Sequence, residues 1–505
     1  MAKELFNGIY SSHKIVFIER IEKNLEFYLK DKILELKKLG QELICTINMS
    51  DLYEVCLELN RNTEIGIDIL SSINLYRSRG KHCILINLSS VNNNFSMLLK
   101  VIIPLERDSE PIQVVQAYES AISILNKVFE AAEFFRERKN LNDSNSDIVL
   151  EAQQLDGIDS FDVYLSTDYD IIEKAFIDTA VSRVSSNEFH KNTILTDVLT
   201  YVSRYDYTAG IFPELCLCMS FEELMQIKVP KRVQYIRMLL SELYRISSHL
   251  YYISRISKIV GSELVFHLSM IERERILRLI ELITGSRINP NFIRIGGVKK
   301  DLNTEKIKAI QETVETVFKT IYRLETLLLD NSIISGKLKN KGFIDRGTAL
   351  ICGVTGPNLR SCGARYDMRK NRNLMLYKDM SFITALGKYG DCLERVLLRF
   401  KEIYQSIKII DQAARDLPEE HIKKLVNLAD IEIPDTEMIS SVECPHGVFK
   451  IFMEIKNDLI LNLLILAPSR NSVYLAEKIL PGNRVEDVEL ILASLDINSG
   501  ELMTG

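Results

Sequence analysis

Apolar residues recur at helical spacing through most of the chain between about residue 170 and residue 415. The longest such segment spans residues 232–260, with Pro230 before it and Gly261 at its end. Its apolar stripe consists of Ile236, Leu239, Leu243, Ile246 and Leu250. The same periodicity predicts further long helices at 263–284, 305–330 and 390–414. These segments together predict a bundle of long helices.

Short runs rich in branched apolar residues occupy both ends of the chain instead. Near the N-terminus, residues 82–88 and 98–104 predict strands, and residues 114–135 have helical spacing. Near the C-terminus, the pattern predicts a β-hairpin and a short terminal helix, at residues 447–455, 459–467 and 485–493. The fold class predicted is therefore α+β, with a small N-terminal α+β domain followed by a mainly helical domain whose C-terminal part is rich in strands.

A polar stretch at residues 137–146 (ERKNLNDSNS) interrupts these patterns and is nearly free of apolar side chains. Such composition is typical of a linker. We expect an N-terminal domain at 1–137, a linker at 138–150 and a second domain at 151–505.

Composition excludes several classes of protein. The net charge of −6 and the absence of a polybasic segment give no reason to expect nucleic-acid binding. No apolar run reaches the ~18–20 residues that cross a bilayer, and the N-terminus has no apolar signal core. None of the nine cysteines forms a C-x-x-C pair, so buried free thiols are expected and no metal site is predicted.

Charged residues gather in a glycine-containing segment at 353–370 (GVTGPNLRSCGARYDMRK). Composition alone favours a solvated surface loop whose charges pair with one another. Further ionisable residues fall within largely apolar stretches, namely Glu242, His249, Glu272, Arg273 and Arg294. Buried charges are normally paired, so these residues form either structural ion pairs or a relay for charge or protons.

The segment 353–370 resembles a loop of the 49 kDa subunit of respiratory complex I, which is related to the large subunit of nickel–iron hydrogenases. Other blocks that resemble the same family follow in the same order, at 229–237, 271–275, 284–288, 292–298, 443–447 and 494–497. The resemblance covers about 195–505. Residues 1–135 more faintly resemble the 30 kDa subunit of complex I. The resemblance implies fused 30 and 49 kDa subunits in the order found in formate hydrogenlyase and energy-converting-hydrogenase-related large subunits.

The resemblance also locates what this chain lacks. Two C-x-x-C pairs hold the metals of nickel–iron hydrogenases, and they align with Asp206 and Ala209 and with Asn498 and Glu501. A nickel centre needs four thiolates, so the chain is expected to bind no metal and no tightly held cofactor of its own.

The residues that react with quinone in complex I are replaced as well. The family's tyrosine aligns with Leu217, and the aspartate that pairs with its histidine aligns with Ile259. Tyr207, Tyr205 and Asp206 are the candidate substitutes, since a phenol or carboxyl group can transfer protons. The expected cleft is lined by Arg204, Leu217, Ile259 and Asp496, and Arg360, Asp367 and Arg369 join the five helix residues in an ion-pair network.

The function implied is that of a subunit in a membrane-associated, complex-I-like oxidoreductase. It would form the quinone-module cleft beside a PSST-type iron–sulfur small subunit, contact membrane-arm subunits on the cytoplasmic face, and couple electron transfer to ion translocation. Two alternatives remain. One is a metal-free coupling or structural subunit of an energy-converting-hydrogenase-related complex, and the other is a stand-alone hydrogenase-like enzyme. Whether the chain is itself catalytic stays open, because its reactive residues differ from those of the family.

Overall fold

The computed structural model describes residues 19–39, 42–78, 81–91, 93, 95–104, 111–129, 148–150, 161–179, 193–371, 375–420, 422 and 433–502. Of the linker predicted at 138–150, residues 138–147 lie outside these ranges, and Ile148–Leu150 form the short strand β6. The chain divides into two compact units, residues 1–138 with 350–353, and residues 139–349 with 354–505. Helices and strands are mixed throughout, which confirms the predicted α+β class.

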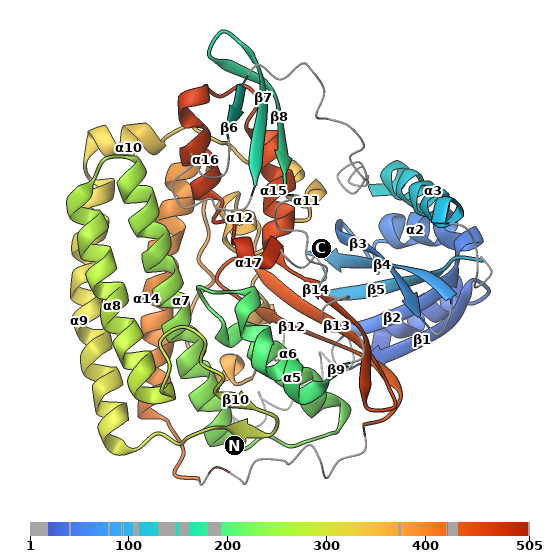
Figure 1. Cartoon of the computed structure of the whole chain (residues 1–505), viewed down its shortest axis with the longest axis horizontal. Coiled ribbons are helices and arrows are strands. Elements are labelled where there is room, and N and C mark those ends of the chain that lie inside the picture. Colours follow the sequence, from blue (N-terminus) through green and yellow to red (C-terminus); the bar gives the residue numbers. More distant parts are fainter. Residues whose placement is uncertain are drawn as a thin grey trace. The chain divides into compact units, whose positions relative to one another are not determined.

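One five-stranded sheet, in the order β1-β2-β5-β4-β3, forms the centre of the first unit (Figure 1). Strands β2 and β5 are parallel, and the other neighbours are antiparallel. The elements are β1 (Ile33–Leu39), β2 (Glu42–Asn48), η1 (Met49–Asp51), α2 (Leu52–Arg61), β3 (Ile69–Ser78), β4 (Lys81–Ser90), β5 (Phe95–Ile102) and α3 (Pro111–Phe129). The strands predicted at 82–88 and 98–104 are confirmed as β4 and β5.

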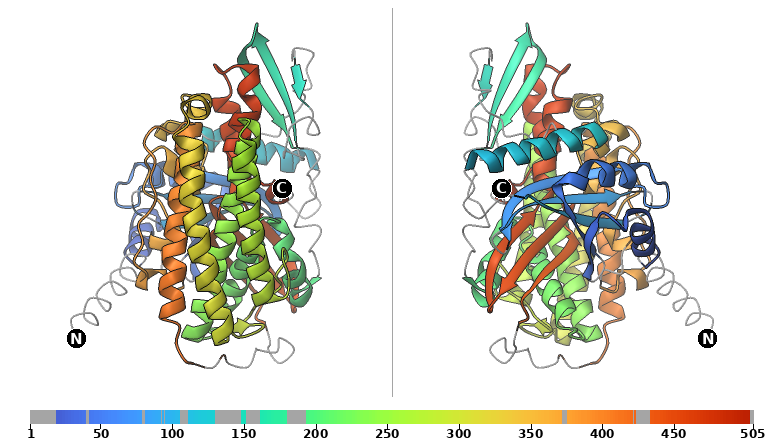
Figure 2. Two further views of the ribbon diagram at one scale, coloured as in Figure 1. Left: turned by 90° about the vertical axis from the view of Figure 1, so that its left-hand side faces the viewer. Right: turned by 90° about the vertical axis from the view of Figure 1, so that its right-hand side faces the viewer.

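Four long helices form the bundle of the second unit, and each lies close to its prediction. They are α7 (Lys231–Ile259), α8 (Glu263–Thr284), α9 (Thr304–Leu329) and α14 (Cys392–Arg415). Helix α7 packs against α8 and α14, and α9 packs against the same two helices (Figures 1 and 2). None of the described helices has the length and apolar content needed to cross a membrane.

Helix α7 is buried well beyond its predicted apolar stripe. Its buried residues include Arg237, Glu242, Arg245 and His249 as well as the five stripe residues. Helix α9 shows the contrasting pattern, because only one stripe is buried, at Ile310, Val314, Val317, Ile321, Leu324 and Leu328. A helix that carries charged residues into the core needs partners for those charges.

An antiparallel sheet in the order β12-β13-β14-β9 accompanies the bundle. The predicted hairpin is confirmed as β13 (Val448–Lys456) and β14 (Leu459–Leu466), preceded by β12 (Thr436–Glu443). The chain closes with α15 (Pro468–Ile479), η8 (Val485–Asp487), α16 (Val488–Ser494) and α17 (Ser499–Leu502). Smaller elements are β6 (Ile148–Leu150), β7 (Asp162–Asp168), β8 (Ile171–Asp178), β9 (Thr193–Ile194), α5 (Leu195–Tyr201), η5 (Val202–Tyr205), α6 (Ile211–Leu224), β10 (Ile293–Arg294), β11 (Gly297–Val298), α10 (Ser332–Leu338), α11 (Arg346–Ile351), α12 (Gly356–Ser361), α13 (Met368–Asn371) and η6 (Tyr377–Asp379).

All nine cysteines are free thiols, and all except Cys362 are buried. The prediction of buried free thiols is confirmed by this distribution. Burial raises the pKa of the Cys45 thiol to about 12. Such a thiol stays protonated near neutral pH and is a poor nucleophile or metal ligand.

The charged segment 353–370 is not the solvated loop that its composition favours. Arg360, Asp367 and Arg369 are at most 1% exposed, and among the charged residues of the segment only Arg365 and Lys370 face solvent. The segment forms α12 and α13 instead of a loop. Its charges are buried because carboxylates from other helices and strands reach them, a tertiary effect that local composition does not report.

Close packing holds this segment against the turn between β12 and β13. Gly356 has a φ of +65°, and a Cβ there would lie 2.4 Å from the Cα of Gly447. We expect Gly356→Ala to lower the free energy of unfolding by several kcal/mol, because the backbone of two segments would have to separate. Gly482→Ala is the matched control, since Gly482 has a φ of +82° but no atom within 4 Å of the added Cβ. Urea unfolding of both variants separates crowding from backbone strain, and equal losses would contradict the crowding.

Candidate functional site

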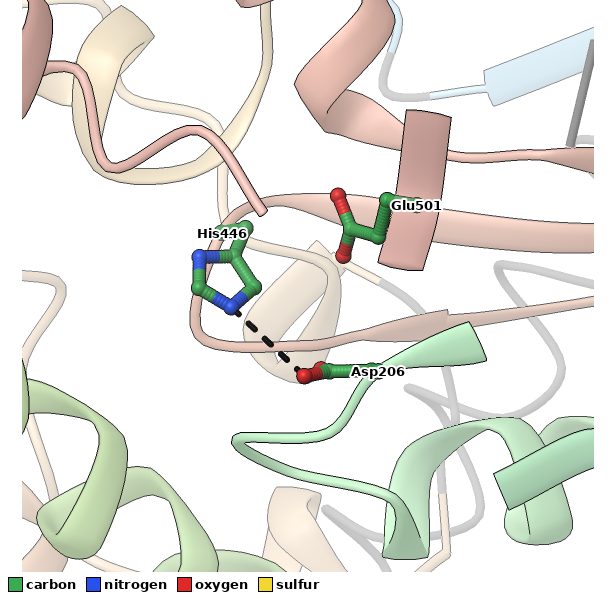
Figure 3. A group of neighbouring side chains, drawn as sticks. All are labelled: Asp206, His446 and Glu501. Carbon is green, nitrogen blue, oxygen red and sulfur yellow. Dashed lines mark ion pairs between the residues drawn. The ribbon is translucent and has the colours of Figure 1, made fainter. Parts of the chain in front are cut away.

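Three segments far apart in sequence bring Asp206, His446 and Glu501 together (Figure 3). Asp206 follows η5, His446 lies in the turn between β12 and β13, and Glu501 belongs to α17. All three side chains are buried. Helix α17 can approach η5 closely because residue 500 is glycine, where a Cβ would lie 2.9 Å from the carbonyl oxygen of Tyr205.

Asp206 is the centre of the hydrogen bonds in this cluster. Its Oδ1 accepts from Thr208 N at 3.0 Å, Thr208 Oγ1 at 2.8 Å, Ala209 N at 2.9 Å and Asn498 Nδ2 at 2.7 Å. Asp206, Ala209, Asn498 and Glu501 are the four positions that the sequence aligns with hydrogenase thiolates. The fold therefore brings these four positions together, and in place of sulfur they carry two carboxylates, one amide and the methyl group of Ala209.

His446 lies between two carboxylates. Its Nδ1 is 3.3 Å from Asp496 Oδ2, an ion-pair distance without hydrogen-bond alignment, and its Nε2 is 3.8 Å from Asp206 Oδ1. Burial alone would lower the pKa of His446, but the carboxylates of Asp496 and Glu501 outweigh burial and raise that pKa well above its usual range. The ring is therefore protonated at neutral pH, and Nε2–H donates to Thr208 Oγ1 at 3.1 Å.

Asp496, the carboxylate that faces Nδ1 of His446, is held in place by its backbone conformation and by Arg399. Asp496 has a φ of +56°, a left-handed conformation that costs a non-glycine residue ~1–2 kcal/mol. Its Oδ2 also lies 3.1 Å from Arg399 Nη2. Burial would raise the pKa of Asp496, but His446 and Arg399 lower it below its usual range. Asp496 is thus an anion held between two cations.

The cluster has the spacing of a cation site, and sequence reasoning missed its histidine. One ligand atom from each of Asp206, His446 and Glu501 lies within 4.8 Å of the others. Both ring nitrogens of His446 already face other groups, Thr208 and Asp496, and a metal ligand must be a neutral imidazole. The arrangement therefore fits a protonated histidine better than a bound divalent ion. The only sequence signal was the place of His446 in the block ECPHG.

Glu501 supplies a carboxyl group that changes charge near neutral pH. Burial raises its pKa to about 7, although His446 opposes the shift. Because the folded-state pKa is raised, the cost of ionising Glu501 grows as pH rises from the unfolded value of ~4.3 and is complete above about 7. We expect Glu501→Gln to stabilise the protein by ~1–3 kcal/mol at pH 8.5 and by clearly less at pH 5. Urea unfolding at both pH values measures this, and an equal effect at the two values would contradict the assignment.

A second buried cluster holds most of the predicted ion-pair residues. Glu242 pairs with Arg245 and Arg369, and accepts from Tyr377 Oη at 2.6 Å and Ser406 Oγ at 2.6 Å. The remaining pairs are Arg369–Asp367 at 2.9 Å, Arg360–Glu402 at 2.7 Å, Arg360–Glu443 at 2.7 Å and His249–Glu402 at 2.9 Å. We call these residues the arginine network. Every ionisable member is at most 1% exposed.

Carboxyl groups outnumber guanidinium groups in the arginine network. Its three guanidinium groups face four carboxyl groups, from Glu242, Asp367, Glu402 and Glu443. Burial raises the pKa of Glu443 even though Arg360 opposes the shift. Burial lowers the pKa of His249 to about 4, so this imidazole is neutral and donates to Glu402.

The turn that carries His446 joins the two clusters. Glu443 belongs to the arginine network, and its carbonyl accepts from Arg245 Nη2 at 2.6 Å. Two residues later, the carbonyl of Pro445 accepts from Arg399 Nη1 at 2.6 Å, and Arg399 pairs with Asp496. This turn therefore accepts hydrogen bonds from Arg245 of the arginine network and from Arg399, the partner of Asp496.

The other predicted residues are distributed unevenly around this site. Asp206 and Asp496 meet through His446, whereas Leu217 is fully buried in α6 and lines no accessible wall of this chain. Ile259 ends α7 and is half-buried. Tyr207 is 40% exposed and lies beside Ser499, with burial raising its pKa, and burial raises the pKa of Tyr205 to about 12.

Within the described part of the chain, four predicted residues form no ion pair or side-chain hydrogen bond with a member of either cluster. Arg204 stacks on the Tyr201 ring at 5.0 Å. Glu272 pairs with Arg275 at 3.1 Å, and Arg294 donates to Asn291 Oδ1 at 2.9 Å. Arg273 stacks on the ring of Tyr251 at 5.0 Å. The predicted network of eight residues is thus smaller, because five of them belong to the arginine network and Glu272, Arg273 and Arg294 do not.

We call the buried group of Asp206, His446, Asp496 and Glu501 the cleft cluster, after the cleft that the resemblance implies. Residues 260–503 match the family described as "Respiratory-chain NADH dehydrogenase, 49 Kd subunit". An NADH-quinone oxidoreductase subunit of Methylacidiphilum infernorum is 30% identical over 68% of this chain and 88% of its own length. The corresponding subunit of Clostridium beijerinckii is 32% identical over 61% and 83%. The chain belongs to this family of 49 kDa subunits.

A solved structure is similar over its whole length. A chain of the membrane-bound sulfane sulfur reductase, described as an archaeal respiratory membrane complex, has a TM-score of 0.68 and 27% identity. The match covers 72% of this chain and 100% of that one. The fold is therefore also found in a respiratory membrane complex whose name does not mention quinone.

Proposed function

We propose that this chain forms the quinone-module cleft of a membrane-associated, complex-I-like oxidoreductase. In this assembly it packs against an iron–sulfur small subunit and membrane-arm subunits on the cytoplasmic face, and it couples electron transfer to ion translocation. We further propose that residues 1–137 act as a module like the 30 kDa subunit. The names of the NADH-quinone oxidoreductase relatives support the quinone assignment.

The observation that carries the proposal is the position of His446 between the carboxylates of Asp206 and Asp496, which raise the pKa of its ring. Reduction of a quinone consumes protons, and a positioned acid speeds such a step. The residues aligned with the family's tyrosine and aspartate are Leu217 and Ile259, which cannot donate. His446, linked through Thr208 to Asp206, is a proton source at the same cleft. Glu501 can replace the proton that His446 gives up, since the pKa of Glu501, about 7, lies near the pH of a neutral medium.

The similarity to the sulfane sulfur reductase favours a second candidate. In that alternative the complex is related to energy-converting hydrogenases and reduces an acceptor other than quinone, or the chain only transmits charge between partners. Buried, apolar Leu217 and the change at Ile259 agree with a cleft that has lost the quinone residues.

Turnover of the complex purified from native membranes tests the two candidates. Inhibitor-sensitive reduction of a short-chain quinone supports the proposal, and mass spectrometry of the same sample identifies the small subunit and membrane-arm subunits. Reduction of a sulfane sulfur compound without quinone turnover supports the second candidate. Turnover with neither acceptor would leave a structural or coupling role.

A further inference from the structure

Two half-buried arginines near the cleft cluster lack the carboxylate partners that Arg360, Arg369 and Arg399 have. Within the described ranges, Arg255 of α7 and Arg273 of α8 make neither a hydrogen bond nor an ion pair. Nε and Nη2 of Arg255 and Nε of Arg273 are closed off from solvent. By contrast, Arg360, Arg369 and Arg399 each bond a carboxylate. A buried donor without an acceptor is costly, so this pair needs an explanation.

Both guanidinium groups are held against one aromatic ring. The ring centroid of Tyr251 lies 5.9 Å from Arg255 Cζ and 5.0 Å from Arg273 Cζ. Tyr251 and Arg255 are one helical turn apart on α7, and Arg273 comes from the neighbouring helix α8. The ring thus lies beside two cations from neighbouring helices, and like charges repel each other.

The acidic side chains nearby are already committed to other cations. Glu272 pairs with Arg275, and Glu274 pairs with Arg278 and Arg287. Asp496 lies near enough for Arg255 to act on its pKa, but its carboxylate contacts His446 and Arg399. Burial lowers the pKa of Arg273, the direction expected for a cation without a neutralising partner.

We propose that Arg255, Arg273 and Tyr251 form a binding site for a small anion of the carboxylate type beside the cleft cluster. The role of this site rests on the proposed function. Within that function, the site would bind an electron acceptor or an effector that carries negative charge. Tyr207 lies at the edge of the site, since both Tyr251 and Arg255 act on its phenol, and it is partly exposed. Guanidinium groups bind carboxylates through paired N–H donors.

Acetate binding to the full-length chain tests the site, with acetamide as the neutral probe of the same shape. Calorimetric titration at constant ionic strength should show acetate binding in the wild type and at least a tenfold weaker affinity in Arg255→Gln/Arg273→Gln. Arg273→Lys should retain binding because it keeps the charge, which protects the test if the double variant fails to fold. Arg275→Gln is the matched control on the same helix, since Arg275 is half-exposed and pairs with Glu272.

Several outcomes would overturn the site. Equal binding of acetate and acetamide, equal binding by wild type and double variant, or an equal loss in Arg275→Gln would each do so. A wild-type chain that binds no acetate, with a double variant that no longer assembles into the complex, would assign the two arginines to a partner's carboxylate instead. Failure of the proposed function is recognised separately, because acetate would still bind while quinone turnover is absent.

Discussion

Replacing Arg360 with methionine is expected to lower the free energy of unfolding of the helical unit by about 3–5 kcal/mol. Arg360 bonds Glu402 at 2.7 Å, Glu443 at 2.7 Å and the carbonyl of Tyr366 at 2.9 Å, and its side chain is fully buried. Methionine fills much of the same volume but leaves two carboxyl groups buried without their shared cation. The uncompensated buried charge causes most of the expected loss, and protonation of Glu402 can relieve only part of it.

Urea unfolding followed by circular dichroism measures this effect. Arg278→Met is the matched control, because Arg278 pairs with Glu274 on the surface and its side chain is 75% exposed. An exposed pair of this kind contributes little, so the control should unfold close to the wild type. A loss for Arg360→Met no larger than that of the control would show that the arginine network is not a source of stability.

The second large effect is expected for His446→Gln. If His446 is the proton donor of the cleft, turnover of the assembled complex should fall ~100-fold or more, in the range that general acids contribute. Glutamine keeps a hydrogen-bond donor toward Thr208 but carries no charge and no transferable proton. His267→Gln is the matched control, because His267 is 68% exposed on α8 and pairs only with Glu263.

The pH dependence of stability separates the donor role from simple misfolding. The pKa of His446 is raised in the folded state, so its stabilising effect is complete below the unfolded value of ~6.5 and is lost as pH rises through the folded pKa. His446→Gln should therefore destabilise the protein most at pH 6 and less at alkaline pH, as measured by urea unfolding. A loss of turnover with unchanged stability at every pH would contradict the ion pairs with Asp206 and Asp496.

Sequence reasoning located the elements well because their signals are local. Helix α8 has the predicted bounds, Glu263–Thr284, since its periodicity ends at Gly285, whose φ of +88° terminates the helix. The hairpin of β13 and β14 follows equally from branched residues around a polar turn. These features depend on residues within a few positions of one another, so the printed sequence contains them.

The site could be predicted only in part because its partners are distant in sequence. Asp206 and Glu501 were found through the positions of missing thiolates, but His446 was not, since nothing near it shows that Asp496 and Asp206 will surround it. The burial of Arg360 has the same origin, because Glu402 and Glu443 arrive from α14 and β12. A charge-rich segment is solvated or buried according to contacts that no local pattern records.

The turn between β12 and β13 should have the same number of residues in every family member that shares this arrangement. Its carbonyls at Glu443 and Pro445 accept from two arginines, and Gly447 lies so close to α12 that a Cβ would be 2.5 Å from Thr355 Oγ1. Inserting one residue would reverse the alternation of side chains along β13 and move His446 away from both carboxylates. Insertions and deletions among relatives with this histidine should therefore fall elsewhere, such as the turn at Asn457 and Asp458, where both residues already adopt positive φ.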